Sequence, residues 1–108
     1  MPNNLTYIHL ASDSAPPSLD IQMPFRAVVI VEQPVSRDWQ LRISDWLVQS
    51  GCLYMMAWGQ DCSSWDDSVD LANLKIFDFG DIPDDQVVMT TWHADEPLSE
   101  VMRFAKNN

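Results

Sequence analysis

The sequence predicts a small α/β domain: a three-layer sandwich with a mostly parallel sheet and about three helices, like half of a Rossmann fold. Two observations predict it. Three short apolar or β-branched segments have the composition of buried strands, and each is followed by apolar residues at helical spacing. The length of 108 residues fits one domain, so residues 1–108 are expected to share a single core. Alternating strands and helices with short connections favour right-handed crossovers and a parallel sheet.

The chain opens with an N-terminal region of 24 residues. Residues 5–10 are compatible with an edge strand, and residues 11–24 are a loop rich in Ser, Asp and Pro. The first core strand is expected over residues 26–32, a β-branched run bounded by Pro24 and Pro34. Because this strand is apolar on both faces, it is expected at the centre of the sheet.

The first helix is expected to begin after Ser36, whose hydroxyl is suited to an N-cap. It should end before Gly51, since glycine readily adopts the left-handed conformation that stops a helix. Its apolar face consists of Trp39, Ile43, Trp46 and Leu47.

The second core strand is expected over residues 52–59 and the second helix over residues 64–77. Ser64 and Asp67 have the spacing of a capping box, with Asp in place of the usual Glu or Gln. The apolar face of this helix consists of Trp65, Val69, Ala72 and Ile76.

An acidic turn over residues 78–85 leads to the third core strand, which is expected over residues 86–92. A last helix follows, with Asp95 or Glu96 as its cap and Pro97 in its first turn. Its inner face consists of Leu98, Val101, Phe104 and Ala105. Trp58 and Trp92 close two of the core strands and are expected in the core.

Composition excludes several classes of function. The formal net charge of −10 argues against a nucleic-acid partner, because phosphate binding needs a basic face. The apolar runs of the sequence, such as residues 27–31, are far shorter than the roughly 18–20 residues of a membrane span. With glycine only at positions 51, 59 and 80, no glycine-rich phosphate loop can be built.

Cys52 and Cys62 are the only cysteines. If residues 52–59 form a strand, the two lie roughly 25–30 Å apart, much too far for a disulfide. Two free thiols and the lack of a secretory signal region predict a cytoplasmic protein.

Reactive side chains follow the second and third core strands, where each strand ends. In open parallel α/β sheets, ligands bind beyond the carboxyl ends of the strands. We therefore expect these side chains to lie at one edge of the sheet. The candidate site consists of Asp61, Cys62, Trp65, Asp66, Asp67, His93, Asp95 and Glu96. Among the tryptophans, Trp65 is the one expected to reach a ligand or partner. No catalytic residue, metal or cofactor is assigned.

Two chemistries are considered for this site. Asp61, His93 and Asp95 or Glu96 would suit Mg²⁺ or Mn²⁺ in a small hydrolase or nucleotide-processing enzyme. The second chemistry is nucleophilic catalysis by a thiolate–imidazole pair of Cys62 and His93, although nearby carboxylates disfavour the thiolate. The alternative to both is that the acids stabilise helix N-termini without any ligand.

The acids are distributed unevenly along the chain. Residues 61–100 contain 11 of the 16 Asp and Glu residues and a single base, Lys75. Such an acidic side would attract basic partners and repel nucleic acid. The alternative is that the charge serves solubility alone.

Two sequence blocks, WGQDCSSWDDSVD at residues 58–70 and TTWHADEPL at residues 90–98, resemble a known family. It is a family of small acidic bacterial proteins classed as a domain of unknown function. The resemblance covers residues 25–106. It implies no activity, because no catalytic residues are assigned in that family.

The leading hypothesis is a protein-binding module rather than an enzyme, with the acidic side of residues 61–100 as its contact surface. An immunity or inhibitor protein acting on a basic partner is one form of it, and an accessory subunit is another. A structural homodimer is a third possibility, and the metal-dependent enzyme is the alternative function.

Overall fold

Three parallel strands form the sheet, in the order in which they occur in the chain. The computed structural model describes residues 14–16 and 24–107, and its sheet has the order β1-β2-β3. The strands are β1 (Phe25–Val31), β2 (Cys52–Gly59) and β3 (Met89–His93). The helices are α1 (Arg37–Gln49), α2 (Ser63–Ile76) and α3 (Leu98–Asn107), with a short 3₁₀ turn, η1 (Asp84–Gln86), before β3. The predicted α/β fold is confirmed. The edge strand expected at residues 5–10 lies outside the described residues.

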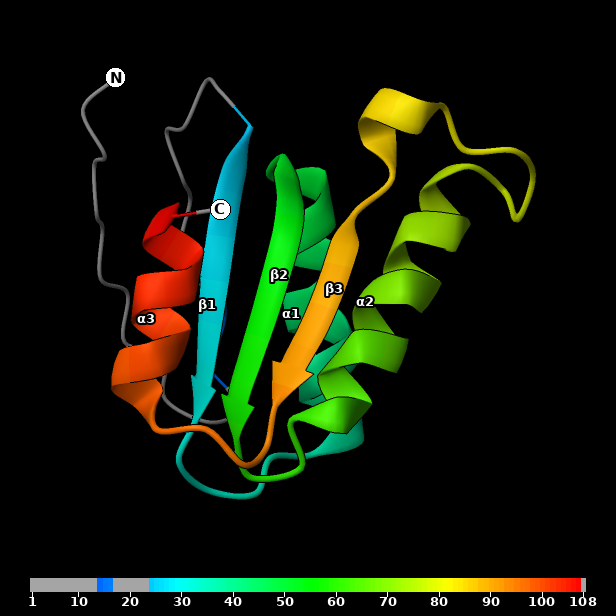
Figure 1. The fold of residues 1–108 in the computed structure, drawn as a ribbon. Helices are drawn as coiled ribbons and strands as arrows, with labels where there is room; N and C mark the ends of the chain where they lie inside the picture. The colour runs from blue at the N-terminus through cyan, green and yellow to red at the C-terminus, as the bar shows by residue number, and fades with distance from the viewer. Residues whose placement is uncertain (1–13, 17–23, 108) are drawn as a thin grey trace.

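The helices cover both faces of the sheet, which gives three layers (Figure 1). Consecutive right-handed crossovers between neighbouring strands place α1 and α2 on the same face. After β3 the chain passes the carboxyl ends of the strands, and α3 packs against β1 and β2 on the opposite face. The side chains of β2, which alternate between the two faces of the sheet, show that α3 lies opposite to α1 and α2. Met55 belongs to the core beneath α1 and α2, whereas the ring of Tyr54 contacts Phe104 of α3.

The main core lies between the sheet and the pair α1 and α2. Met55 of β2 and Val69 of α2 are fully buried there. Trp39 of α1 and Trp65 of α2 meet edge to face, with ring centroids 6.5 Å apart. The indole nitrogen of Trp39 also donates to the carbonyl of Ser14 at 2.8 Å, which attaches the short described segment 14–16 to α1.

A buried polar network joins α1 to α2. The spacing of apolar residues in the sequence did not predict it. Gln40 donates from Nε2 to the hydroxyls of Ser64 and Ser68 at 3.1 and 3.2 Å. The Ser44 hydroxyl donates to that of Ser68 at 3.0 Å. Gln40, Ser44 and Ser68 are all buried. Because each polar group has a partner, the two helices can approach closely without an unsatisfied donor between them.

The ends of α1 agree with the sequence prediction, whereas the start of α2 differs from it. Ser36 caps α1, accepting the N–H of Trp39 at 3.2 Å, and Gly51 follows the helix with φ of +103°. The capping box expected from Ser64 and Asp67 is wrong. The helix already begins at Ser63, and the Ser64 hydroxyl donates to the carbonyl of Asp61 at 2.7 Å instead.

The third strand starts three residues later than expected. Asn73 of α2 is the physical reason, since its side chain bonds the backbone that precedes β3. Its Nδ2 donates to the carbonyl of Gln86 at 3.1 Å, and its Oδ1 accepts the N–H of Val88 at 3.0 Å. These side-chain bonds satisfy groups that the expected strand would have used in the sheet ladder.

None of the helices in the described parts of the chain is both long and apolar enough to cross a membrane.

Candidate functional site

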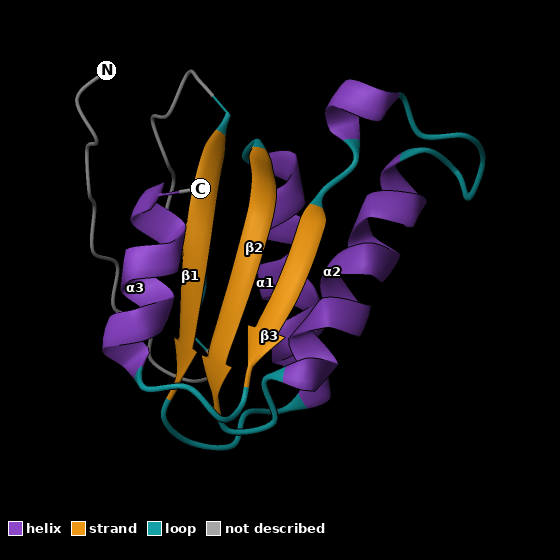
Figure 2. Ribbon diagram, in the orientation of Figure 1, coloured by secondary structure: helices purple, strands orange, loops and turns teal. Residues whose placement is uncertain are grey.

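The loops that carry the candidate residues lie at one edge of the sheet. β2 and β3 are parallel neighbours, and Trp58 is in register with His93. Asp61 and Cys62 follow the end of β2, and Asp95 follows the end of β3. The loops that carry Asp61, Cys62 and Asp95 therefore lie, together with the end of β3, at the carboxyl edge of the sheet (Figure 2). The side chains of these residues have different environments.

His93 is held in place on the α3 face of the sheet. The residue is 7% exposed, and its ring packs against Phe104 with centroids 5.5 Å apart. Nδ1 lies 3.1 Å from Oε1 of Glu96, and Nε2 lies 2.9 Å from Oγ1 of Thr91. With both ring nitrogens engaged, this imidazole is a structural link between β3 and the loop that leads to α3.

Cys62 and Trp65 are core residues, so neither side chain is exposed at the carboxyl edge. They are 3% and 2% exposed, and both belong to the core beneath α1 and α2. Cys62 therefore lies on the face of the sheet opposite to His93, and the thiolate–imidazole pair does not form. Cys52 is also buried, and burial raises the pKa of its thiol to about 11. Both thiols are free, as predicted.

The acids at the start of α2 contact the neighbouring strand. The hydroxyl of Thr90 on β3 donates to Asp66, and it lies 3.3 Å from an oxygen of Asp70. Partial burial and the nearby charge of Asp66 raise the pKa of Asp70, while the Thr90 hydrogen bond opposes the shift. Asp66 thus ties α2 to β3, whereas Asp67 is exposed to solvent.

The expected metal ligands do not assemble into a metal site. Within residues 14–16 and 24–107, no three His, Cys, Asp or Glu side chains gather closely enough to hold an ion. The imidazole of His93 has neither nitrogen available, and its carboxylate partner is Glu96. The geometry therefore gives no support to the metal-dependent enzyme.

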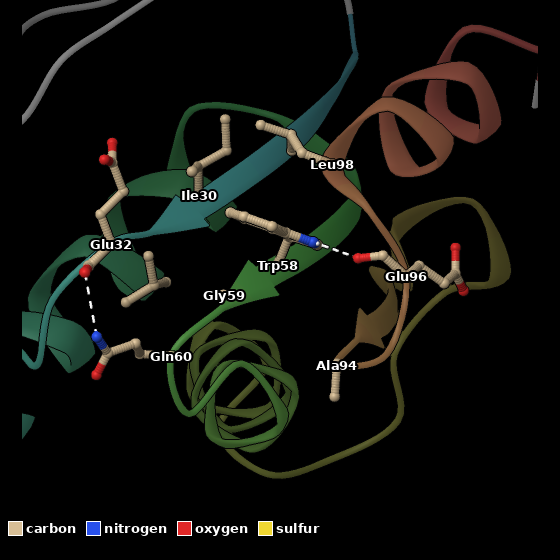
Figure 3. A pocket seen from close by; sticks show the side chains of 9 residues that line it. Ile30, Glu32, Trp58, Gly59, Gln60, Ala94, Glu96 and Leu98 are labelled. Atoms are coloured by element: carbon tan, nitrogen blue, oxygen red, sulfur yellow. Dashed lines mark hydrogen bonds between the residues drawn. The ribbon is translucent and has the colours of Figure 1, made fainter.

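An open hollow of about 680 Å³ lies at the carboxyl ends of β1 and β2 (Figure 3). Trp58 forms part of its lining, and its indole nitrogen donates to the carbonyl of Glu96 at 2.7 Å. On the opposite side, Nε2 of Gln60 donates to the carbonyl of Glu32 at 3.2 Å. The lining residues are Ile30, Val31, Glu32, Trp58, Gly59, Gln60, Ala94, Glu96 and Leu98.

Trp58 was expected in the core, and this hollow was not among the expected sites. The available signal was its place as the penultimate residue of a strand, at the edge where ligands bind. The lining offers apolar side chains and two carboxylates, with no imidazole, thiol or basic group.

Exposed carboxylates gather on the side of the molecule formed by α2, β3 and the loops at both of their ends. We call these nine side chains the acidic surface: Asp61, Asp67, Asp70, Asp78, Asp81, Asp84, Asp85, Asp95 and Glu96. The only base in residues 61–97 is Lys75. Its ammonium group lies 3.0 Å from a carboxylate oxygen of Asp45. Glu100 lies apart on α3, where it pairs with Arg103 at 3.4 Å.

Comparison with known proteins identifies the family. A domain of unknown function (DUF7684) matches residues 5–108. The chain belongs to this family. The match confirms the resemblance to a domain of unknown function. No curated protein and no solved structure matches the chain.

As a member of DUF7684, the chain inherits no activity from its family description. Its function has to be argued from its surface. The most distinctive feature of that surface is the charge on the α2 and β3 side.

Proposed function

We propose that this DUF7684 domain is a cytoplasmic protein-binding module, not an enzyme, and that its acidic surface binds a partner with a basic surface. An inhibitor or immunity protein that covers a basic partner is the concrete form, and an accessory subunit is the other. Two buried, free thiols fit a reducing compartment.

One observation carries the proposal. Nine exposed carboxylates lie on α2, on the loops before and after it, and on the loop after β3, and the single base among residues 61–97 is already bound by Asp45. Like charges placed together in this way repel each other when the domain is alone. A basic partner relieves that repulsion, and the field speeds association with it.

The test compares charge reversal inside and outside the acidic surface. The first variant carries Asp81→Lys, Asp84→Lys and Asp85→Lys, three exposed positions near η1. The matched control carries the same change in net charge at exposed acids elsewhere, as Glu32→Lys, Asp38→Lys and Glu100→Lys. Urea unfolding of both variants establishes that they fold. The partner is captured from the native host on the wild-type chain, purified, and titrated against each variant.

The association rate of the first variant is expected to fall by about tenfold or more at low salt, because steering depends on the local field. The control variant should lose much less. Raising the ionic strength should remove most of the difference, because salt screens exposed charges. Binding that is indifferent to salt, or equal losses in both variants, would overturn the proposal.

A further inference from the structure

β3 lies at the border of the sheet. Within the part of the chain that the structure describes, it pairs with β2 and has no second neighbour. Along such an edge, alternate residues direct their N–H and C=O groups outward, where another strand can pair with them. Natural edge strands are commonly protected by Lys or Pro. The sequence of β3, Met-Thr-Thr-Trp-His, has neither and is rich in residues that favour strands.

Two large apolar side chains flank this edge and remain exposed. Trp92 is 50% exposed and Met89 is 57% exposed. They lie on opposite faces of the sheet. Trp92 is in register with the core residue Ala57, on the α2 face, whereas Met89 is in register with Tyr54, on the α3 face. The expected burial of Trp92 is therefore wrong, because among the described residues no further strand lies beside β3.

The two faces beside the edge differ in charge. On the α2 face, Thr90 bonds to Asp66 and Asp70, so the carboxylates of α2 lie next to β3. On the other face, α3 packs mainly over β1 and β2, and it contacts β3 at His93, the last residue of the strand (Figure 1). A strand added to β3 would therefore contact carboxylates and an indole on one face. It would contact Met89 on the other.

This asymmetry decides between a second copy of the chain and a different partner. Antiparallel pairing of two β3 edges about a two-fold axis perpendicular to the sheet would bring the α2 carboxylates of both copies together. With a net charge of −10 on each chain, that arrangement is electrostatically unfavourable. A segment with basic side chains at alternate positions has the complementary charge. Each base would lie near both the carboxylates and the ring of Trp92, which favours cation–π contact.

We infer that the outer edge of β3 receives an extended, basic segment of the partner as a fourth strand. Its basic side chains face Asp66, Asp67 and Asp70, and its apolar side chains face Met89. This mode of binding rests on the proposed function and adds to it the chemistry of the bound segment. Main-chain hydrogen bonds to β3 supply affinity, and the alternation of basic and apolar residues supplies specificity.

The test uses a short synthetic peptide that alternates Arg and Val, and a peptide of the same composition in which the arginines are contiguous. Calorimetry gives the affinities, and amide hydrogen exchange locates the binding site. The variant Trp92→Glu removes the aromatic contact while adding an acid. The matched control, Phe79→Glu, changes an aromatic that is 64% exposed in the loop after α2. Met89→Glu tests the opposite face, and urea unfolding establishes that each variant folds.

The alternating peptide is expected to bind more tightly than the contiguous one and to slow exchange of amides within residues 89–93. Trp92→Glu should weaken this binding by about tenfold or more, and Phe79→Glu should leave it within about twofold of wild type. Binding by charge alone predicts the opposite for Trp92→Glu, since an added acid attracts a basic peptide.

Three outcomes would overturn the inference. The first is that the two peptides bind equally and that Trp92→Glu binds them as tightly as wild type or more tightly. In that case the proposed function still stands, without the inference about the β3 edge, if the reversal of Asp81, Asp84 and Asp85 weakens partner binding. The second is failure of both peptides to bind. The third is a dimer in sedimentation that Trp92→Glu dissociates, which would assign the edge to a second copy.

Discussion

Gly59 allows the chain to leave β2 and enter α2 within a few residues. It has φ of +108°, and Asp61 follows with φ of +51°, so two left-handed residues reverse the chain direction. A Cβ atom at position 59 would lie 2.1 Å from the carbonyl oxygen of Val31. That oxygen also accepts the N–H of Gln60 at 2.9 Å. The close approach of β1 and the turn after β2 therefore requires glycine here.

Gly59→Ala is expected to destabilise the domain by on the order of 2–4 kcal/mol, because backbone strain and a clash with β1 add together. Gly51→Ala is the matched control. Gly51 has a similar φ of +103°, but a Cβ atom there meets nothing within 4 Å. Gly51→Ala should lower the free energy of unfolding by about 1 kcal/mol, from backbone strain alone. Urea unfolding of both variants measures the two free energies, and equal values would contradict the role assigned to Gly59.

Asp70 gives the carboxylates of α2 a measurable dependence on pH. Its pKa is raised in the folded state, chiefly by partial burial and the charge of Asp66. The folded chain thus binds this proton more tightly than the unfolded chain. The resulting cost to stability is absent below the unfolded pKa and complete once the pH rises past the raised folded value.

Asp70→Asn should therefore stabilise the domain at pH 7 by about 0.5 kcal/mol or less, since solvent screens this exposed group. At pH 3 the two proteins should unfold with the same free energy, because both side chains are then neutral. The amide oxygen of Asn can still accept from Thr90. Urea unfolding at both pH values checks this, with Asp85→Asn as a loop control. A gain that persists at pH 3 would show that charge is not the cause.

At the scale of elements, the start of β3 is determined by α2. Asn73 is 4% exposed, and its amide bonds both Gln86 and Val88 on the segment that leads into the strand. Val88 is itself buried, so its N–H group has no access to water if Asn73 is lost. One helix side chain therefore positions the edge strand and the acidic loop before it.

Asn73→Ala is expected to cost about 2–3 kcal/mol, because it removes two hydrogen bonds and leaves a buried donor unsatisfied. Leu74→Ala on the same helix is the control, since Leu74 is 38% exposed and makes no such bond to the strand. Its cost should stay near 1 kcal/mol. Urea unfolding gives both values, and amide exchange should increase around residues 86–89 in Asn73→Ala alone. Similar costs in the two variants would refute this role of Asn73.

At the scale of the whole molecule, the charge is divided between two sides. The acidic surface occupies the α2 and β3 side, while Arg26 and Arg37 belong to β1 and α1 and Arg103 to α3. Repulsion among the acids opposes folding, and salt screens exposed charges more than buried ones.

Salt should therefore stabilise this domain. Raising NaCl to about 0.5 M at neutral pH is expected to increase the free energy of unfolding by on the order of 1 kcal/mol. The variant with Lys at positions 81, 84 and 85 should gain clearly less. The Glu32, Asp38 and Glu100 control should gain almost as much as wild type, because its changes lie outside the acidic surface. Thermal unfolding over a salt series measures the three responses, and destabilisation of the wild type by salt would contradict the interpretation.

Local patterns were enough to predict the elements of the fold and their order. The apolar runs specify β1 and β2, Ser36 and Gly51 specify the ends of α1, and alternation of strands with helices specifies parallel pairing. The free state of Cys52 and Cys62 followed from their separation along a strand. The uneven distribution of acids was also visible, because charge can be counted without coordinates.

Exposure of the tryptophans was decided by tertiary structure. Trp65 and Trp92 both lie near the carboxyl edge, yet Trp65 is 2% exposed and Trp92 is 50% exposed. The first meets Trp39 of α1, and the second lies on a strand with only one neighbour. Neither fact is local, because each depends on which segments become neighbours in space.

The candidate site was divided for the same reason. Cys62 lies beneath α1 and α2, whereas His93 lies beneath α3. Strand alternation determines which residues of a strand share a face, but only the course of the chain after β3 determines which helix covers each face. The sequence by itself therefore determined the elements, the common edge and the charge. The packing of α1 and α2 on one face of the sheet and of α3 on the other decided which side chains are buried at that edge.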